Sequence, residues 1–132
     1  AAEEARAVFA VEPVEKLRRY IKDKACQAGY DNVYPVDGLI TELPFPDGFA
    51  DVTMGGHVFG DYLEAEHAEM ARVTRPGGML ILCPGSGITE QKAHNFLVEQ
   101  GFEWAVFVEP PNDRVRKYWK RLPDQVYLDS VG

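Results

Sequence analysis

The amino-acid sequence predicts an α/β fold in which a mostly parallel sheet carries helices on both faces. Short apolar runs alternate with amphipathic segments along the chain. Several of these runs end at a carboxylate or at small residues, and open α/β sheets bind their ligands at such strand ends. The 132 residues are 45% hydrophobic and 27% charged, so we expect a single soluble domain over residues 1–132.

The chain begins with a predicted strand and helix. Residues 7–12 are an apolar run that ends at the carboxylate of Glu12, and Pro13 then suits the first turn of a helix. Apolar residues recur at spacings of three and four over residues 14–28, which is the pattern of one helical face. Gly29 is a natural end for this helix.

Two further strands are predicted in the next part of the chain. Residues 32–37 form a short run that again ends at a carboxylate. Residues 43–49, with the sequence LPFPDGF, then predict a loop and a tight turn, because proline presets φ and glycine tolerates a positive φ. Residues 50–54 are mostly apolar and lead into Gly55 and Gly56, where a ligand can approach the backbone closely.

The alternation continues with a helix and a strand. Asp61 is the predicted N-cap of a helix that runs to Thr74. The sequence RPGG over residues 75–78 ends it, since proline cannot extend a helix and glycine permits the reversal. Residues 79–83 have no polar side chain and form the strongest predicted strand.

The last elements are a helix and a hairpin. Thr89 is the predicted cap of a helix that ends near Gln100. Residues 102–109 and 115–120 flank a turn rich in proline, asparagine and aspartate. They predict an antiparallel hairpin, so the last strand runs against the rest of the sheet.

The net charge of −7 argues against nucleic acid or an anionic membrane surface as a partner. The last strand is nevertheless basic, and a solvated face or ion pairs explain such a cluster more readily than contact with an anionic substrate. Aromatic residues in the hairpin are more typical of core than of a platform for stacking bases. The basic residues are Arg114, Arg116, Lys117, Lys120 and Arg121, and the aromatic ones are Trp104, Phe107, Tyr118 and Trp119.

The sequence predicts a cytoplasmic protein. No apolar run approaches the roughly 20 residues of a membrane span, and no signal-peptide pattern is visible. Cys26 and Cys83 lie far apart in mostly apolar surroundings, so we expect buried, reduced thiols.

Two segments resemble the class I S-adenosylmethionine-dependent methyltransferases. LPFPDGFADV over residues 43–52 is similar to the family's LPFPDGSFDVV-like loop and strand, and EMARVTRPGG over residues 69–78 is similar to its ExxRVLKPGG helix end. Both follow, in order, the VFAVE run at residues 8–12. The resemblance covers about residues 7–121. It implies a three-layer Rossmann-like sheet, mostly parallel with an antiparallel last strand, and S-adenosylmethionine as the cofactor.

The resemblance also implies cofactor-binding residues. Glu12 matches the acid that holds the ribose hydroxyls, for which the two acceptor oxygens of a carboxylate are suited. We place Pro13, which follows it, in the same site. Asp37 matches the acid that accepts from the adenine amino group, and Gly38 and Leu39 come where contacts to the base are implied. Without the resemblance, Glu12 could be a solvated strand-end carboxylate and Asp37 a turn-forming residue.

Gly55, Gly56 and His57 match the family segment near the methionine part of the cofactor and the transferring methyl group. His57 is the catalytic candidate, because a base there could take a proton from the acceptor. Placing the acceptor in line with a sulfonium methyl needs no base, so a contact with the cofactor backbone and an ordinary loop histidine are alternatives. We expect His67 to be structural and His94 to be solvated. The histidines are not spaced like a metal site, so no metal is expected.

One feature of the family is absent from the sequence. Its glycine-rich first motif, resembling DxGxGxG, should lie on a first strand and loop ahead of the helix that ends at residues 1–7. We therefore expect a truncated domain that lacks the middle strand of the sheet, between the strand ending at Glu12 and the strand at Val52. Such a fragment should bind the cofactor poorly. Its two unpartnered strands could pair with another copy of the chain and form a homo-oligomer.

The leading interpretation is methyl transfer from S-adenosylmethionine, by direct displacement, to a nucleophile on a small molecule or a protein. The fold does not predict which acceptor is used. The alternative is a non-catalytic structural or interaction module with an incomplete methyltransferase fold. A nicotinamide-binding domain would also carry an acid at the end of its second strand, but the RVTRPGG sequence over residues 72–78 disfavours it.

Overall fold

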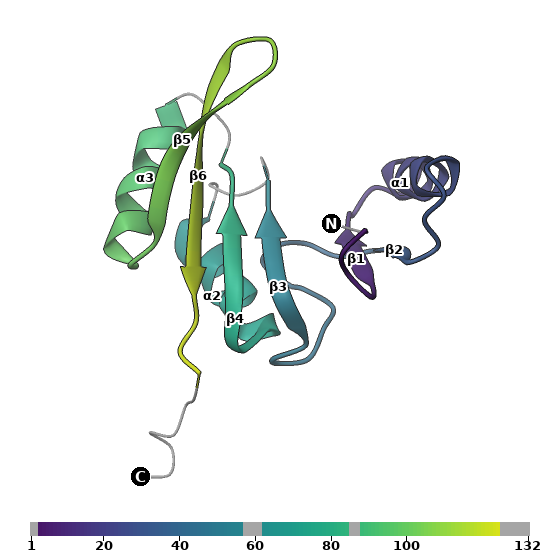
Figure 1. Cartoon of the computed structure of the whole chain (residues 1–132). Coiled ribbons are helices and arrows are strands. Elements are labelled where there is room, and N and C mark those ends of the chain that lie inside the picture. The colour runs from purple at the N-terminus through teal and green to yellow at the C-terminus, as the bar shows by residue number, and fades with distance from the viewer. Residues whose placement is uncertain (1–2, 57–61, 85–87, 125–132) are drawn as a thin grey trace, which may run out of the picture. The chain divides into compact units, whose positions relative to one another are not determined.

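The computed structural model describes residues 3–56, 62–84 and 88–124. Residues are grouped in two compact units, Ala1–Pro44 and Phe45–Gly132, and each is described by itself. Two strand pairs are parallel and the last strand is antiparallel to both of its neighbours, which confirms the predicted α/β class. The elements in chain order are β1 (Val8–Val11), α1 (Glu15–Gln27), β2 (Val33–Val36), β3 (Ala50–Gly55), α2 (Leu63–Val73), β4 (Thr74–Leu82), α3 (Ile88–Glu99), β5 (Glu103–Glu109) and β6 (Asp113–Arg121) (Figure 1).

The first unit is a parallel strand pair with its connecting helix. β1 and β2 pair in register from Val8 opposite Val33 to Val11 opposite Val36. Right after β1, the chain forms α1, which packs against β2. The helix begins at Glu15, so Pro13 precedes the first turn and does not occupy it, contrary to the prediction.

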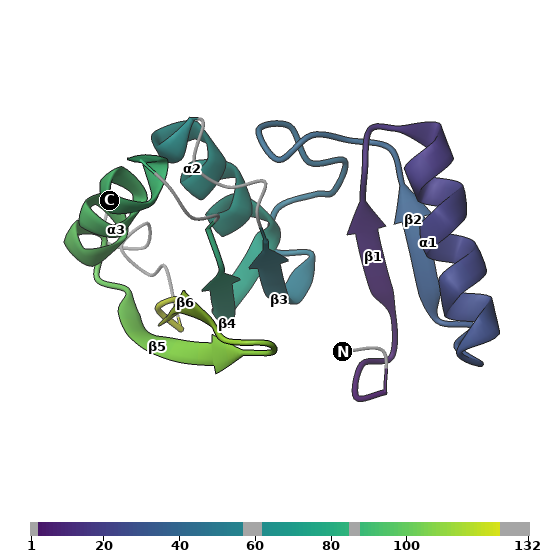
Figure 2. The same cartoon turned by 90° about the horizontal axis from the view of Figure 1, so that it is seen from above.

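The second unit is a four-stranded sheet in the order β3-β4-β6-β5. Figure 2 shows α2 and α3 on the same face of this sheet. The hydrophobic core lies between these helices and the sheet, and both helices and the sheet contribute buried apolar side chains to it. They are Met70 and Val73 of α2, Ala93 and Leu97 of α3, Leu80 and Leu82 of β4, Phe102, and Tyr118 of β6.

Neither β1 nor β3 has a second strand neighbour within the described residues. β1 pairs only with β2, and β3 only with β4. An open strand edge leaves a row of backbone donors and acceptors available for another strand.

The turn from α2 into β4 is tighter than predicted. The strand begins at Thr74, directly after the helix, and includes the RPGG segment that was expected to precede it. Thr74 pairs with Ala50, and the next pair joins Val52 to Met79, so the register shifts between them. Gly77 has a φ of +78°, which only glycine adopts readily and which lets the chain make this irregular passage.

The predicted helix caps fare differently. α3 begins at Ile88, so Thr89 lies inside the helix and not at its cap position, and that prediction is wrong. The predicted cap at Asp61 lies outside the described residues, and α2 is described from Leu63. The cap at Thr89 was chosen from residue type, which does not fix a helix start to within one residue.

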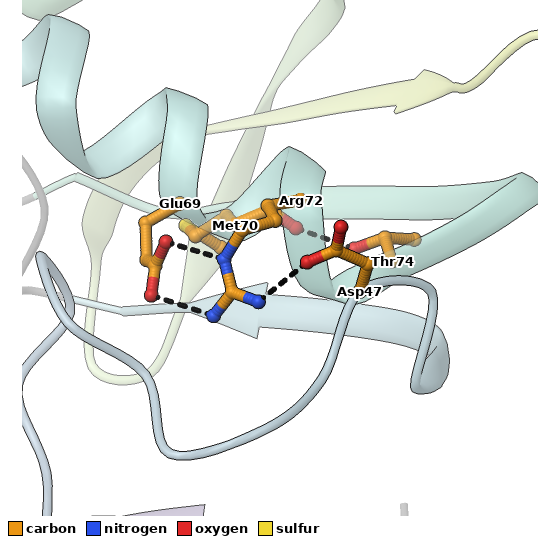
Figure 3. Close-up of polar contacts among 5 residues, drawn as sticks. All are labelled: Asp47, Glu69, Met70, Arg72 and Thr74. Carbon is orange, nitrogen blue, oxygen red and sulfur yellow. Dashed lines mark hydrogen bonds and ion pairs between the residues drawn. The ribbon is translucent and has the colours of Figure 1, made fainter.

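Arg72 joins the end of α2 to the turn that precedes β3 (Figure 3). Its Nε and Nη2 donate to the two carboxylate oxygens of Glu69 at 2.7 and 2.8 Å, and its Nη1 donates to Asp47 Oδ1 at 2.8 Å. The backbone N–H of Gly48 donates to the carbonyl oxygen of Arg72 at 2.8 Å. Hydrogen bonds to Glu69 and Asp47 raise the pKa of Arg72, so its charge is held in place.

Thr74 closes the same turn through its side chain. Its hydroxyl donates to the carbonyl oxygen of Met70 at 2.7 Å, which satisfies one of the open carbonyls at the end of α2 (Figure 3). Thr53 Oγ1 of β3 lies 2.6 Å from Thr74 Oγ1. A hydroxyl has one proton and that of Thr74 is committed, so Thr53 is the donor to Thr74. Thr74 is only 3% exposed, so these bonds are shielded from water.

His67 is a packed structural histidine, as predicted. Its ring meets the edges of Phe96 and Phe102, with both centroid distances at 5.7 Å. Its Nε2 is buried and has no hydrogen-bond partner among the described residues. Burial lowers the pKa of His67, and the nearby charge of Lys120 lowers it further.

His94 and the hairpin aromatics depart from the predictions. His94 is half-buried, and its Nδ1 lies 2.8 Å from the hydroxyl oxygen of Tyr118, so it is not simply solvated. Tyr118 is fully buried as predicted, but Trp104 is 43% exposed and Phe107 is 42% exposed. The hairpin is therefore only partly core. Cys26 also differs from expectation, because it is exposed.

We predict that Thr74→Val destabilises the protein by about 1–2 kcal/mol, because Thr53 and Met70 each lose a buried hydrogen-bond partner. Urea unfolding followed by circular dichroism measures the change. Thr53→Val removes only the donor and should cost less. The double variant should cost less than the sum of the two single variants, and strictly additive costs would show that the hydroxyls do not interact.

We predict that His67 makes the protein less stable in acid. Its folded-state pKa lies below the ordinary value of 6.5, so the unfolded chain takes up the proton first as the pH falls through 6.5. The free energy of unfolding therefore declines until the pH is below the folded-state pKa. Urea unfolding at pH values on both sides of 6.5 measures this decline. His67→Leu should flatten it and Lys120→Gln should reduce it, whereas profiles parallel to the unmodified chain would contradict the assignment.

Candidate functional site

The predicted carboxylates Glu12 and Asp37 lie at the same edge of the first unit. Val11 and Val36 form the last pair of the β1–β2 ladder, and the backbone N–H of Glu12 donates to the carbonyl oxygen of Val36 at 2.9 Å. Glu12 and Asp37 therefore follow neighbouring parallel strands at their carboxyl ends. This is the edge at which open α/β sheets bind ligands.

Arg18 of α1 connects the two strand ends. Its Nη1 donates to the carbonyl oxygen of Glu12 at 2.8 Å and lies 3.4 Å from Asp37 Oδ1. The arginine side chain is 24% exposed and the aspartate side chain is 74% exposed, so the pair is open to water on one side. The sequence interpretation missed Arg18. It is the basic residue one turn inside the helix that leaves the Glu12 strand end, and such a cation can reach back to the edge.

Both carboxylates keep acceptor oxygens that a ligand could use. Glu12 Oε2 accepts a hydrogen bond from the backbone N–H of Val14 at 3.0 Å, which fixes the carboxylate beside the start of α1. Oε1 of Glu12 and Oδ2 of Asp37 have no partner among the described residues. Each ionised oxygen accepts more than one hydrogen bond, so the pair suits a ligand that carries O–H or N–H donors.

The residues after Asp37 give the edge an apolar part. A Cβ at Gly38 would lie 2.9 Å from both Val11 Cγ1 and Pro44 Cδ, so packing alone requires glycine here. Leu39 is 54% exposed and presents an apolar side chain next to the carboxylates. Pro13 is exposed beside Glu12. The first unit thus brings together Glu12, Pro13, Asp37, Gly38 and Leu39 at one edge.

Gly55 and Gly56 belong to the second unit, and the structure gives them different roles. Gly55 is buried, and a Cβ on it would lie 2.9 Å from Leu82 Cδ2 and 3.3 Å from Met70 Cε. Gly56 is exposed, and a Cβ there would meet no atom of the described residues within 4 Å. Gly55 is therefore a packing requirement at the end of β3, whereas Gly56 leaves open space. The catalytic candidate His57 lies outside the described residues.

Glu66 is a buried carboxylate that the sequence interpretation missed. It is 1% exposed on α2, one helical turn before Met70, whose side chain packs beneath Gly55. Because α2 runs from the carboxyl ends of β3 and β4 towards their amino ends, Glu66 lies near the carboxyl edge. Burial of a carboxylate is costly unless it is compensated. Its spacing of four from Met70 on the inward face is the signal that could have identified it.

A shallow hollow of about 210 Å³ lies at the other end of the sheet, on the amino side of β3 and β4. Arg75 Nε donates to Asp51 Oδ1 at 2.7 Å on its rim. The hollow contains none of the residues predicted to bind the cofactor. The hollow is lined by Asp51, Val52, Arg75, Gly77, Gly78, Met79, Ile81 and Arg121.

Two kinds of site do not occur in the part of the chain that the structure describes. In residues 3–56, 62–84 and 88–124, no three histidine, cysteine, aspartate or glutamate side chains gather in a way that could hold a metal ion. None of the helices described there has the length and apolar character needed to cross a bilayer.

Comparison with sequence families gives one match and one absence. A family model described as a methyltransferase domain matches residues 1–82. A search of curated protein sequences finds no match.

Comparison with solved structures shows a shared fold. A SAM-dependent methyltransferase from Aquifex aeolicus is 17% identical with a TM-score of 0.67, and the match covers 86% of this chain and 67% of that one. A SAM-dependent methyltransferase from Methanosarcina mazei is 13% identical with a TM-score of 0.69, over 94% and 85% of the two chains. The [4+2]-cyclase SpnF is 14% identical with a TM-score of 0.71, over 94% and 70%. At these identities the likeness concerns the fold alone.

We predict that Gly55→Ala destabilises the protein by about 1–3 kcal/mol, because the added methyl group overlaps Leu82 in a packed core. The matched change Gly56→Ala adds a methyl group in open space and should stay within about 0.5 kcal/mol of the unmodified chain. Urea unfolding of the two variants measures the difference. Equal costs at the two positions would contradict the packing role of Gly55.

Proposed function

Because the family model for a methyltransferase domain matches residues 1–82, the chain belongs to that family, and we propose that it transfers a methyl group from S-adenosylmethionine to an acceptor nucleophile. The transfer would be a direct displacement, in which the acceptor's lone pair forms the new bond while the bond between carbon and sulfur breaks. We place the reaction in the cytoplasm, the compartment that the sequence predicts.

The pairing of Glu12 and Asp37 at the carboxyl ends of β1 and β2 is the observation that carries the proposal. We propose that the Glu12 carboxylate accepts from the ribose hydroxyls and that Asp37 accepts from the adenine amino group. Each has an oxygen without a partner among the described residues, and the 54% exposed Leu39 offers the base an apolar contact. The cofactor supplies a methyl group on a positively charged sulfur, which makes that carbon reactive.

Arg18 would act in this site as a positioning residue. Its Nη1 holds the carbonyl oxygen of Glu12 at 2.8 Å, so the end of β1 is fixed while the carboxylate stays free to accept. Its charge lies 3.4 Å from Asp37 Oδ1 and offsets the repulsion between two neighbouring carboxylates.

The rate of a methyl transfer depends mainly on placing the acceptor in line with the methyl group. We propose that Gly55 and Gly56, at the carboxyl end of β3, lie where this alignment is made, since no atom of the described residues would meet a Cβ at Gly56 within 4 Å. His57, which follows them, is the proposed base for acceptors that must lose a proton. The acceptor is either a small molecule or a protein.

A second candidate is a non-catalytic interaction module. The open edges of β1 and β3 among the described residues favour it, because each could pair with a strand of another copy of the chain or of a different protein. Cofactor binding separates the two candidates.

We predict that Glu12→Gln weakens binding of S-adenosylhomocysteine by about tenfold, because a charge-assisted hydrogen bond is lost. Isothermal titration calorimetry measures the affinity. Glu15→Gln is the matched control, since Glu15 is exposed and, among the residues that the structure describes, pairs only with Arg19 on the next turn of α1. Equal affinities for the two variants would contradict the role of Glu12, and the absence of any binding to a verified full-length chain would favour the interaction module.

A further inference from the structure

The β5–β6 hairpin continues beyond the end of the parallel strands of its unit. β4 pairs with β6 only from Met79 opposite Arg121 to Leu82 opposite Tyr118. β5 and β6 go on pairing as far as Glu109 opposite Asp113. Residues 105–109 and 113–117, which we name the hairpin arm, therefore extend past the carboxyl ends of β3 and β4 (Figure 1).

One face of the arm combines an apolar row with a cationic row. Successive residues of a strand point to opposite faces, so the pair Trp104–Tyr118 at the base of the arm shares one face with the pairs Val106–Arg116 and Val108–Arg114 within it. On β5 the apolar members are 43%, 48% and 65% exposed, in order towards the tip. Tyr118 of this face meets His94 of α3, so the row begins at the helix-covered side of the sheet.

The charges of the two faces differ. Arg116 stacks over the ring of Trp104 at 5.5 Å, and Arg114 is exposed and has no ion pair among the described residues. On the opposite face Lys117 lies 3.2 Å from Glu109 Oε2 and stands over the ring of Phe107 at 5.1 Å. Only the first face thus presents an arginine charge beside exposed apolar side chains, in a chain whose net charge is −7.

We propose that this face of the arm binds a small molecule with a carboxylate group and an apolar body. The body would lie along Trp104, Val106 and Val108, and the carboxylate would meet the guanidinium group of Arg114. A guanidinium group matches the geometry of a carboxylate, and apolar contact reduces its competition with water. The arm extends past the carboxyl ends of β3 and β4, the edge where the methyl group would be transferred. The bound molecule would therefore be the methyl acceptor, and this part of the inference rests on the proposed function.

Tryptophan fluorescence gives a direct test. The chain has two tryptophans, so Trp119→Phe leaves Trp104 as the only one. This single-tryptophan protein is titrated with decanoate and, separately, with decyltrimethylammonium, which has the same chain length and the opposite charge. Decanoate should shift the emission of Trp104 and reach saturation, while the cation should bind about fivefold more weakly or worse. Equal binding of the two probes would overturn the proposal.

Two variants in the same background locate the site. Arg114→Gln should weaken decanoate binding by about fivefold, whereas Lys117→Gln, a change on the opposite face of β6, should leave it unchanged. Val108→Ser should also weaken binding, because it removes exposed apolar surface near the tip. Circular dichroism checks that the variants are folded. If Arg114→Gln and Lys117→Gln weaken binding equally, the proposal is wrong.

Calorimetry with S-adenosylhomocysteine keeps this proposal separate from the proposed function. In a verified full-length chain, binding of decanoate without binding of S-adenosylhomocysteine would support the carboxylate site and refute its role in methyl transfer. Binding of S-adenosylhomocysteine without a decanoate response at Trp104 would refute the carboxylate site alone.

Discussion

The guanidinium group of Arg72 is the contact on which the second unit depends. The guanidinium group donates to Glu69 of the same helix and to Asp47 of the turn before β3. The backbone carbonyl oxygen of Arg72 accepts a hydrogen bond from the backbone N–H of Gly48. One residue thereby fixes both the end of α2 and the start of the strand that pairs with β4. A second pair, from Arg75 to Asp51, repeats the connection further along the chain. These contacts explain why a PDG turn and an ExxR helix end occur together in this sequence: each supplies half of one charged network.

Fixing that end of the sheet also sets the opposite edge. With α2 held at its C-terminus, Met70 packs beneath Gly55, and Glu66 lies one turn closer to the carboxyl edge. β3 and β4 end there, and the β5–β6 hairpin continues past them. In the first unit, parallel pairing of β1 and β2 places Glu12 and Asp37 together at the carboxyl ends of the two strands. The residues proposed to bind ligands are therefore placed by strand direction and register, since the carboxyl ends of parallel strands meet at one edge.

Much of the candidate site could be predicted because its residues directly follow apolar runs. Apolar runs and residue type placed Glu12 and Asp37 at strand ends, whereas their cofactor roles came from the family resemblance. Their adjacency follows from parallel pairing. Arg18 and Glu66 were missed, since a charged residue on a predicted helix is ordinarily assigned to the solvated face. Whether such a side chain reaches back to a strand end or is buried depends on how the helix packs. The same limit applies to the basic cluster of β6, whose members are divided between two faces by the cross-strand register.

Hydrophobic periodicity and turn residues are local properties, so they predicted the order of the elements, the α/β class, a mostly parallel sheet and an antiparallel last strand. Three features emerged only in the folded chain: the early start of β4 at Thr74, the exposure of Trp104 and the bond between His94 and Tyr118. It also gave Gly55 and Gly56 their different roles, which no local pattern separates. These features depend on contacts between elements that are far apart in the chain. Such contacts form only when the core has packed, so local sequence patterns do not reveal them.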